Sequence, residues 1–174
     1  MRFFILILSV LLSGSATTWA QKTLSFYHTH TKEKFSGVYH DGKSHQLNTL
    51  KKINLFLRDH RTGSIQTIDV KLLDILWDIA KILNPEHPEK ICFDVISGYR
   101  SPKTNEMLRT TKGGVSKKSL HMEGKAIDIR VKNVSLSLLR DSAKSLKRGG
   151  VGCYPNEKFV HVDTGRVRYW GFME

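Results

Sequence analysis

Two strand-like segments, in which ionisable side chains alternate with branched apolar ones, constrain this sequence most. In residues 126–131, AIDIRV, Asp128 stands between two isoleucines, and in residues 159–165, FVHVDTG, His161 and Asp163 alternate with valines. Because residues i and i+2 of a strand share a face, His161 and Asp163 are expected on one side of a sheet. An ionised carboxylate among apolar neighbours is costly, so Asp128 requires a cationic partner inside the fold.

The rest of the chain mixes helical and strand patterns. Apolar residues recur at helical spacing, and short β-branched runs bounded by turn residues predict strands. The two kinds of segment are interleaved irregularly, which predicts an α+β domain with a small, mixed or antiparallel central sheet and flanking helices, not a doubly wound fold. The expected helices are 46–58, 69–83, 101–111 and 135–147, and the expected strands are 24–30, 35–40, 91–97, 126–131, 151–154, 159–165 and 167–170.

The first twenty residues have a different character. Arg2 precedes an apolar run at 3–12, which is too short for a stable membrane anchor, and small residues lead up to Ala20. These features predict that residues 1–20 are a secretory signal peptide cleaved after Ala20. An uncleaved anchor or a buried helix is the disfavoured alternative. The expected location is periplasmic or secreted.

Residues 21–174 are expected to form a single domain, since 154 residues fit one ordinary core. Within it, residues 21–45 are interpreted as an N-terminal hairpin appendage. The histidines of that segment suggest a metal site, but exposed positions on a surface hairpin are the preferred interpretation for His28, His30, His40 and His45.

The chain is strongly basic, with a formal net charge of +12. Without residues 1–20, whose only charged residue is Arg2, 27 Lys and Arg stand against 16 Asp and Glu, a net charge of +11. Such a charge attracts anionic partners. Anionic cell-wall polymer or a membrane surface suits a secreted protein better than nucleic acid, and no interleaving of aromatic and basic residues indicates nucleic-acid binding. We expect a monomer.

Cys92 and Cys153 are the two cysteines, and each lies in an apolar, strand-like segment. A disulfide between them is compatible with an oxidising compartment, and two buried free thiols are equally compatible with the sequence. Their spacing matches no zinc–thiolate pattern.

His121 precedes the strand of Asp128, so two imidazoles and one carboxylate are available together with His161. This set is typical of open zinc sites, in which three protein ligands leave the fourth position for water. Zinc lowers the pKa of bound water to about 7. An ion pair of Asp128 with Arg100 or Arg130 would also compensate the carboxylate, and spacing alone does not separate the two interpretations.

A longer pattern separates them. Residues 119–128, SLHMEGKAID, resemble the S-x-H-x-x-G-x-A-x-D signature of the zinc D-alanyl-D-alanine peptidase superfamily, which also includes the signalling domain of Hedgehog proteins. The segment SGYRS at 97–101 stands where that family has a substrate-binding arginine. Segments 58–76 and 149–170 resemble its periplasmic murein-endopeptidase branch. The resemblance covers residues 22–171.

The resemblance implies a Hedgehog/D-Ala-D-Ala-peptidase-like fold and one zinc ion held by His121, Asp128 and His161. Gly124 would shape the ligand loop because it has no side chain to crowd the metal. Ser119 would shape the same loop and contact substrate.

Arg100 would position the substrate through its planar guanidinium, with Tyr99 beside it as a further substrate contact. The general base is where this chain departs from the family. Many relatives carry an acid three residues before the last ligand, and this chain has Lys158 there. Asp163 is the preferred candidate, either as the base or as an orienting partner of His161, and Glu157 is the alternative base.

The sequence therefore predicts a zinc metallopeptidase that hydrolyses peptide cross-links of peptidoglycan through metal-activated water. Resemblance favours an endopeptidase over a D,D- or L,D-carboxypeptidase on the same fold. A non-catalytic zinc module that binds cell wall or a partner protein is the alternative, because position 158 lacks the acid.

Overall fold

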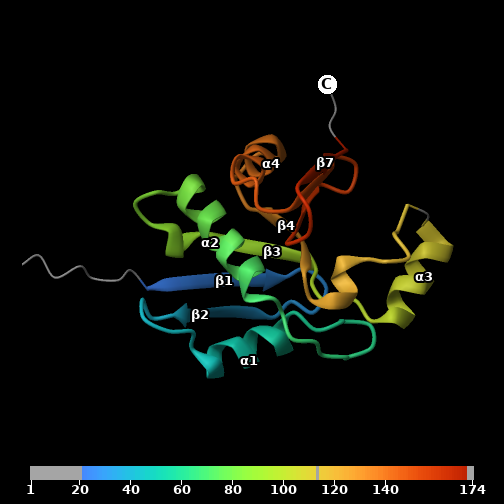
Figure 1. Cartoon of the computed structure of the whole chain (residues 1–174), viewed down its shortest axis with the longest axis horizontal. Coiled ribbons are helices and arrows are strands. Elements are labelled where there is room, and N and C mark those ends of the chain that lie inside the picture. The colour runs from blue at the N-terminus through green and yellow to red at the C-terminus, as the bar shows by residue number, and fades with distance from the viewer. Residues whose placement is uncertain (1–20, 113, 172–174) are drawn as a thin grey trace, which may run out of the picture.

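The computed structural model describes residues 21–112 and 114–171 (Figure 1). The expected signal peptide at 1–20 lies outside them. The described chain forms one mixed sheet with α-helices around it. The strands are β1 (Lys22–His28), β2 (Lys34–His40), β3 (Cys92–Ser97), β4 (Ala126–Val131), β5 (Gly150–Tyr154), β6 (Phe159–Asp163) and β7 (Arg168–Trp170). The helices are α1 (Leu47–Phe56), α2 (Val70–Leu83), α3 (Pro102–Lys112) and α4 (Leu136–Ser145), with short 3-10 turns η1 (Pro88–Lys90) and η2 (Leu120–Glu123).

The strand order is β2-β1-β3-β4-β6-β5-β7. The β1–β3 and β5–β7 pairs are parallel, and the other pairs are antiparallel. The expected α+β class with a mixed central sheet is confirmed. The hairpin within residues 21–45 is not an appendage, because β1 pairs with β3 and the hairpin thereby forms one edge of the same sheet.

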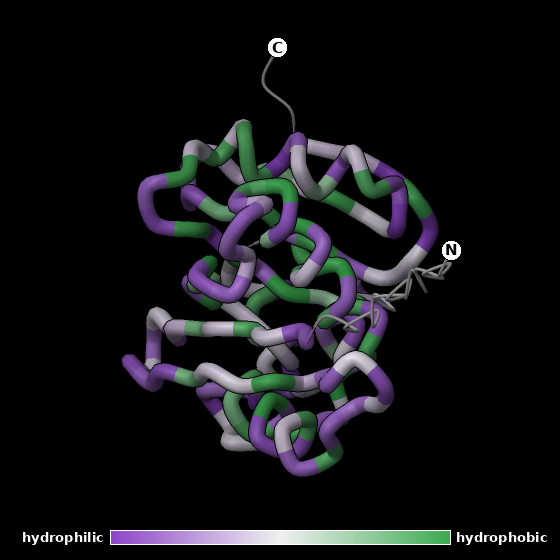
Figure 2. The backbone as a smooth tube through the Cα atoms, turned by 90° about the vertical axis from the view of Figure 1, so that its left-hand side faces the viewer, coloured by the Kyte–Doolittle hydropathy of each residue, from purple (hydrophilic) through white to green (hydrophobic). Residues whose placement is uncertain are grey.

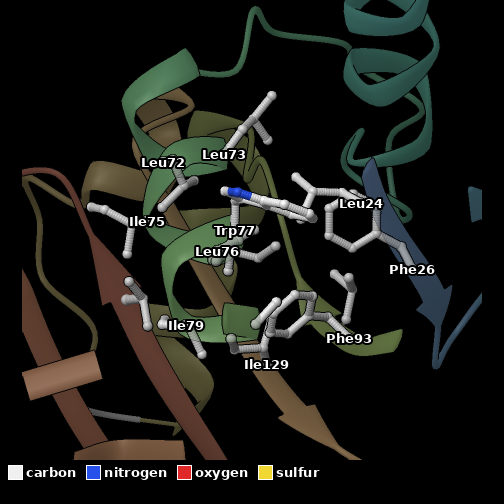
Figure 3. Packing of buried hydrophobic residues seen from close by; sticks show 14 of the residues in the cluster. Leu24, Phe26, Leu72, Leu73, Ile75, Leu76, Trp77, Ile79, Phe93 and Ile129 are labelled. Carbon is white, nitrogen blue, oxygen red and sulfur yellow. The ribbon is translucent and has the colours of Figure 1, made fainter. Parts of the chain in front are cut away.

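The hydrophobic core lies on one face of this sheet. Figure 3 shows side chains of α2 packed against Leu24, Phe26, Phe93 and Ile129 from three strands. Leu139 and Ala143 of α4 join the same cluster beside the valines of β5 and β6. Figure 2 shows hydrophobic segments gathered in the interior and mostly hydrophilic outer loops. With this face filled by helices, the polar residues of β4 and β6 are left on the opposite face.

Local signals in the sequence account for the helix starts. Asp69 accepts a hydrogen bond from the amide of Lys71 at the start of α2, and Ser135 accepts one from Leu138 at the start of α4. At α3, the hydroxyl of Ser101 accepts the amide N–H of Thr104 at 3.2 Å. Figure 1 shows α3 at one end of the molecule, away from α2 and α4.

Two expectations from the sequence need correction. His28 is not exposed: its side chain is 1% exposed, and its Nδ1 accepts the amide N–H groups of His30 and Thr31. The side chain of His28 points into the protein because β1 is a strand of the central sheet. Both cysteines are free, and Cys92 is exposed rather than buried. A disulfide to Cys153 is ruled out in this fold, because β4 and β6 separate their strands.

Within residues 21–112 and 114–171, no helix combines the length and apolar character needed to cross a bilayer.

Candidate metal centre and groove

Five residues from five neighbouring strands form a row across the open face of the sheet. The strand registers place Ser97 opposite Asp128, Asp128 opposite His161, His161 opposite Gly152, and Gly152 opposite Trp170. Because side chains alternate along a strand, the flanking isoleucines and valines of β4 and β6 point to the core instead. The alternation seen in the sequence therefore sorts the ionisable residues onto one surface.

Three predicted ligand atoms converge in this row. His121 Nε2 lies 3.2 Å from Asp128 Oδ1 and 3.2 Å from His161 Nδ1, and His161 Nδ1 lies 2.9 Å from Asp128 Oδ1. His121 and Asp128 are buried, and the side chain of His161 is nearly so. Among the described residues, these three form the one group of histidine, cysteine or acidic side chains with metal-site spacing.

The outer nitrogen of each imidazole is held by a fixed acceptor. His121 Nδ1 donates to the carbonyl oxygen of Gly98 at 2.8 Å, so its Nε2 carries a lone pair. His161 Nε2 lies 2.9 Å from Asp163 Oδ2, which leaves Nδ1 toward Asp128. Such outer partners orient metal ligands and select their tautomers.

Asp163 is fully buried and saturated with hydrogen bonds. Besides His161, its carboxylate accepts two bonds from Arg168, at 2.7 and 3.0 Å, and the amide N–H groups of Gly150 and Gly165. These donors lower the pKa of Asp163 despite its burial. Asp163 does not line the groove described below, so its position supports an orienting role rather than proton transfer with water.

The converging residues change one another's pKa. Burial opposes ionisation of Asp128, yet His121 and His161 lower the pKa of its carboxyl. Burial likewise disfavours a charged His161, but the hydrogen bonds to Asp128 and Asp163 raise its pKa to about 9. Two imidazole nitrogens and a carboxylate oxygen thus converge on one point, an arrangement that a bound cation would stabilise.

The donor set fits a tetrahedral metal ion. Ligands bound at about 2.0–2.1 Å to tetrahedral zinc lie about 3.3 Å from one another. The three distances between the candidate ligand atoms, 2.9–3.2 Å, are close to that value. The predicted ligands are therefore brought together, with their outer atoms already tethered.

The ligand loop is shaped by backbone contacts. Gly124 ends η2 with φ 67°, and a Cβ there would lie 2.2 Å from the carbonyl oxygen of Thr67. Its own carbonyl accepts the amide N–H of Asp69 at 3.0 Å. Glycine is thus required by a left-handed turn packed against the segment before α2, not by the approach of a metal as the sequence suggested.

A groove of about 630 Å³ runs over the centre. Arg100 lines it and is 9% exposed; its Nη2 lies 3.4 Å from Asp128 Oδ2 and 3.4 Å from Ser97 Oγ. Ser119 also lines the groove, as expected. Tyr99 does not: it packs against the hydrophobic core, because consecutive residues of this extended segment face opposite ways.

The two remaining candidates near the last strands differ in position. Glu157 is exposed and lines the groove. Lys158, at the position where many relatives have an acid, is exposed with φ 56° and does not line it. Among the described groove residues, the carboxylates are therefore Asp128 and Glu157.

Sequence reasoning missed an aromatic wall on the far side of His161. Trp170 Nε1 donates to the hydroxyl of Tyr154 at 2.9 Å, and its ring centre lies 5.3 Å from that of His161. Phe159 stacks on Tyr154 at 4.5 Å. Gly152 makes room for Trp170, since a Cβ there would lie 2.4 Å from the indole. Gly152, which pairs with the predicted ligand His161, is the feature of the sequence that could have indicated this aromatic wall.

Comparison with known proteins agrees with this geometry. The family described as peptidoglycan L,D-endopeptidase MepK matches residues 16–170. The peptidoglycan L,D-endopeptidase MepK of Escherichia coli (strain K12) is 38% identical over 157 residues, covering 90% of this chain and 84% of the relative. The probable peptidoglycan L,D-endopeptidase MepK of Haemophilus influenzae is 41% identical over 149 residues, covering 86% and 78%.

The match extends over the ligand loop, the β4 and β6 strands and the arginine segment, and the resemblance expected from the motifs is confirmed. The chain belongs to the MepK family of peptidases, a branch of the zinc D-alanyl-D-alanine peptidase superfamily.

Proposed function

We propose that this protein is a zinc-dependent endopeptidase that hydrolyses peptide cross-links of peptidoglycan in the periplasm. The observation that carries the proposal is the convergence of His121 Nε2, Asp128 Oδ1 and His161 Nδ1 within a groove that Arg100 also lines. The names of the relatives support L,D-endopeptidase activity in particular.

His121, Asp128 and His161 would hold the ion. Bound zinc would supply Lewis acidity toward a substrate carbonyl and a water molecule. The surrounding chain keeps the ligand atoms in place: the Gly98 carbonyl fixes the tautomer of His121, and Asp163 fixes that of His161. Arg168 in turn neutralises Asp163, so the buried carboxylate remains ionised beside His161.

Arg100 orients the peptide. Its guanidinium is mostly buried, and its Nε has no hydrogen-bond partner among the described residues. A buried N–H without a partner costs free energy unless a ligand accepts its hydrogen bond. We assign Arg100 to a carbonyl or carboxylate of the substrate, next to the metal ligand Asp128.

Glu157 is the proposed acid–base group. It is the groove carboxylate that is not a metal ligand, and its exposure allows it to reach bound substrate. In this role it takes a proton from the attacking water and returns it to the leaving amine. Asp163 is proposed as the positioning partner of His161.

Export is part of the proposal. A signal peptide at 1–20 would deliver the chain to the periplasm, where its substrate lies. The net charge of the remaining chain, +11, favours approach to an anionic polymer.

The test is hydrolysis of purified cross-linked muropeptides, with and without a chelator and with zinc added back. We expect a new amine and a new carboxylate for each cleaved bond, loss of cleavage with chelator, and recovery with zinc. His121→Ala should abolish cleavage, and Glu123→Gln, an exposed residue of the same turn, should not.

Three outcomes would contradict the proposal. Absence of chelator-sensitive product with every cross-link type would remove the peptidase, and tight muropeptide binding without cleavage would favour a binding module. Release of a terminal residue alone would indicate a carboxypeptidase.

A further inference from the structure

A second arginine stands on the wall of the groove. Arg61 lines it together with Arg100, although the two are 39 positions apart in sequence. The turn that carries Arg61 follows α1 and closes through hydrogen bonds between Asp59 and residues 63–64: Gly63 N–H to Asp59 O at 2.7 Å and Asp59 N–H to Ser64 O at 2.9 Å. Nothing in the peptidase mechanism above uses Arg61.

One buried carboxylate ties the two arginine segments together. Asp59 is 1% exposed; its Oδ1 accepts the backbone N–H of Arg61 and its Oδ2 accepts that of Ser101, both at 2.9 Å. Ser101 directly follows Arg100. A single rigid side chain therefore fixes the backbone beneath both guanidinium groups, and the hydrogen bonds keep the pKa of Asp59 well below its usual range despite burial.

A stack of histidines supports the same turn from its other side. The ring of His60 stacks on His30 with centroids 4.2 Å apart and planes 10° apart, and it lies 5.5 Å from the buried ring of His28. The backbone of the turn is thus fixed by Asp59 and by the packing of the adjacent His60 ring, which limits the backbone entropy lost when the exposed Arg61 side chain binds a ligand.

Within the described residues, the exposed residue Arg61 carries a positive charge that no salt bridge pairs. Arg61 makes no ion pair there, while Arg168 and Arg100 face Asp163 and Asp128. Arg100 also has its unpartnered, buried Nε. The guanidinium of Arg61 is therefore available to an anionic group of a ligand in the groove.

We infer that Arg61 and Arg100 form a two-arginine clamp for a free carboxylate of the cross-linked peptide, with Asp59 as the residue that positions the clamp. The inference rests on the proposed function and deepens it. A carboxylate matches the planar guanidinium fork, which can bind it bidentately, whereas a primary amide accepts fewer hydrogen bonds and carries no charge.

The clamp makes Arg61 a specificity residue. It would favour cross-linked peptides with a free carboxylate beside the scissile bond over amidated ones. Because its contact is present before and during the reaction, loss of Arg61 should raise KM more than it lowers kcat.

The experiment compares a synthetic cross-linked peptide with its counterpart in which that carboxylate is a carboxamide. Both peptides are assayed with the wild type and three variants: Arg61→Ala, Arg61→Lys and the matched control Arg58→Ala. Arg58 lies in the same segment and loses the same charge, but it pairs with Glu33 and does not line the groove. Peptide affinity of the metal-free proteins is measured by calorimetry in parallel.

We expect Arg61→Ala to raise KM about 10- to 100-fold for the carboxylate peptide and to leave the amide peptide nearly unchanged. Arg61→Lys should recover part of the loss, and Arg58→Ala should match the wild type. Equal KM values for wild type and Arg61→Ala on the carboxylate peptide would overturn the clamp. Absence of cleavage by the wild type would instead contradict the proposed function, and calorimetry would then decide the clamp separately: an affinity of the metal-free protein unaffected by Arg61→Ala would overturn it.

Asp59→Asn tests the positioning role. It should raise KM for the carboxylate peptide in the wild-type background and raise it less in the Arg61→Ala background, because there only its effect through Ser101 and Arg100 remains. Fully additive effects on KM would show that Asp59 acts independently of Arg61 and would overturn its positioning role, and thermal unfolding of each variant measures any separate effect on stability.

Discussion

His161 Nε2 lies 2.9 Å from Asp163 Oδ2, on the side of the imidazole ring opposite to Asp128. Both residues come from β6, two positions apart, and the ring bridges a fixed carboxylate and the candidate metal position. Because residues i and i+2 of a strand share a face, the alternation in β6 places Asp163 where it can orient the imidazole ring of His161 before a metal binds.

Asp163→Asn should weaken zinc binding about 10- to 100-fold, because the ring loses the acceptor that holds its tautomer. Competition with a chromogenic chelator measures the affinity. Glu123→Gln, an exposed residue of the same turn as His121 that is not among the candidate ligands, serves as the control. Unchanged zinc affinity together with lost hydrolysis would instead indicate that Asp163 is the base.

Glu157→Gln should lower kcat about 10²- to 10⁴-fold with unchanged zinc content, since the amide cannot accept a proton from water. Steady-state assays and metal analysis of the purified variant measure both quantities. Lys158→Gln changes the adjacent side chain, which does not line the groove, and should retain activity. A kcat of Glu157→Gln equal to that of the wild type would show that Glu157 is not the general base.

Gly152→Ala should displace the Trp170 ring, because the new Cβ would lie 2.4 Å from its Cε2 atom. Overpacking of this kind costs about 1–3 kcal/mol of stability. The tryptophan fluorescence spectrum should shift, and Trp170→Phe isolates the contribution of Trp77 in the core. An unchanged spectrum and an unchanged unfolding midpoint would show that the aromatic wall adapts without cost.

His28 should make the fold sensitive to acid. Burial and the neighbouring His30 lower its pKa from 6.5 to about 4, so the folded state favours the neutral ring. The unfolded chain then binds more protons below pH 6.5, and stability falls as the pH drops from 6.5 toward 4 by up to about 3 kcal/mol. Above pH 6.5 the ring is neutral in both states and the effect vanishes.

His28→Asn keeps an acceptor for the amides of His30 and Thr31 and removes the titrating ring. Its stability, measured by denaturant titration, should fall less steeply than that of the wild type between pH 6.5 and 4. The exposed His87→Asn change is the control. Parallel stability curves for wild type and His28→Asn would contradict the assignment.

Much of the fold could be predicted because its signals are local. Asp69 and Ser135 cap the helices that follow them, and the alternation in β4 and β6 assigned Asp128 and His161 to a polar face. The error over the hairpin came from a non-local fact: pairing of β1 with β3 joins segments 67 positions apart, as at Ser25 and Cys92, and leaves no trace in either segment alone.

The candidate site divides in the same way. The candidate ligands His121, Asp128 and His161 were predicted from the sequence through their spacing and the resemblance, and the structure brings them together. The role of Gly124 was misassigned because its contact with Thr67 belongs to a distant loop. Tyr99 was placed at the substrate because a sequence does not say which way one residue of an extended segment turns.

The sequence by itself determined which residues alternate, where helices begin, and which side chains are chemically able to hold a metal, since these depend on neighbours a few positions away. Only the tertiary structure decided that Asp163 is sealed behind His161, that Trp170 crosses Gly152, and that Asp59 joins Arg61 to Arg100. Those relations depend on the order of the strands and on the packing of the loops. Both are set when segments far apart in the sequence bury their apolar surfaces together.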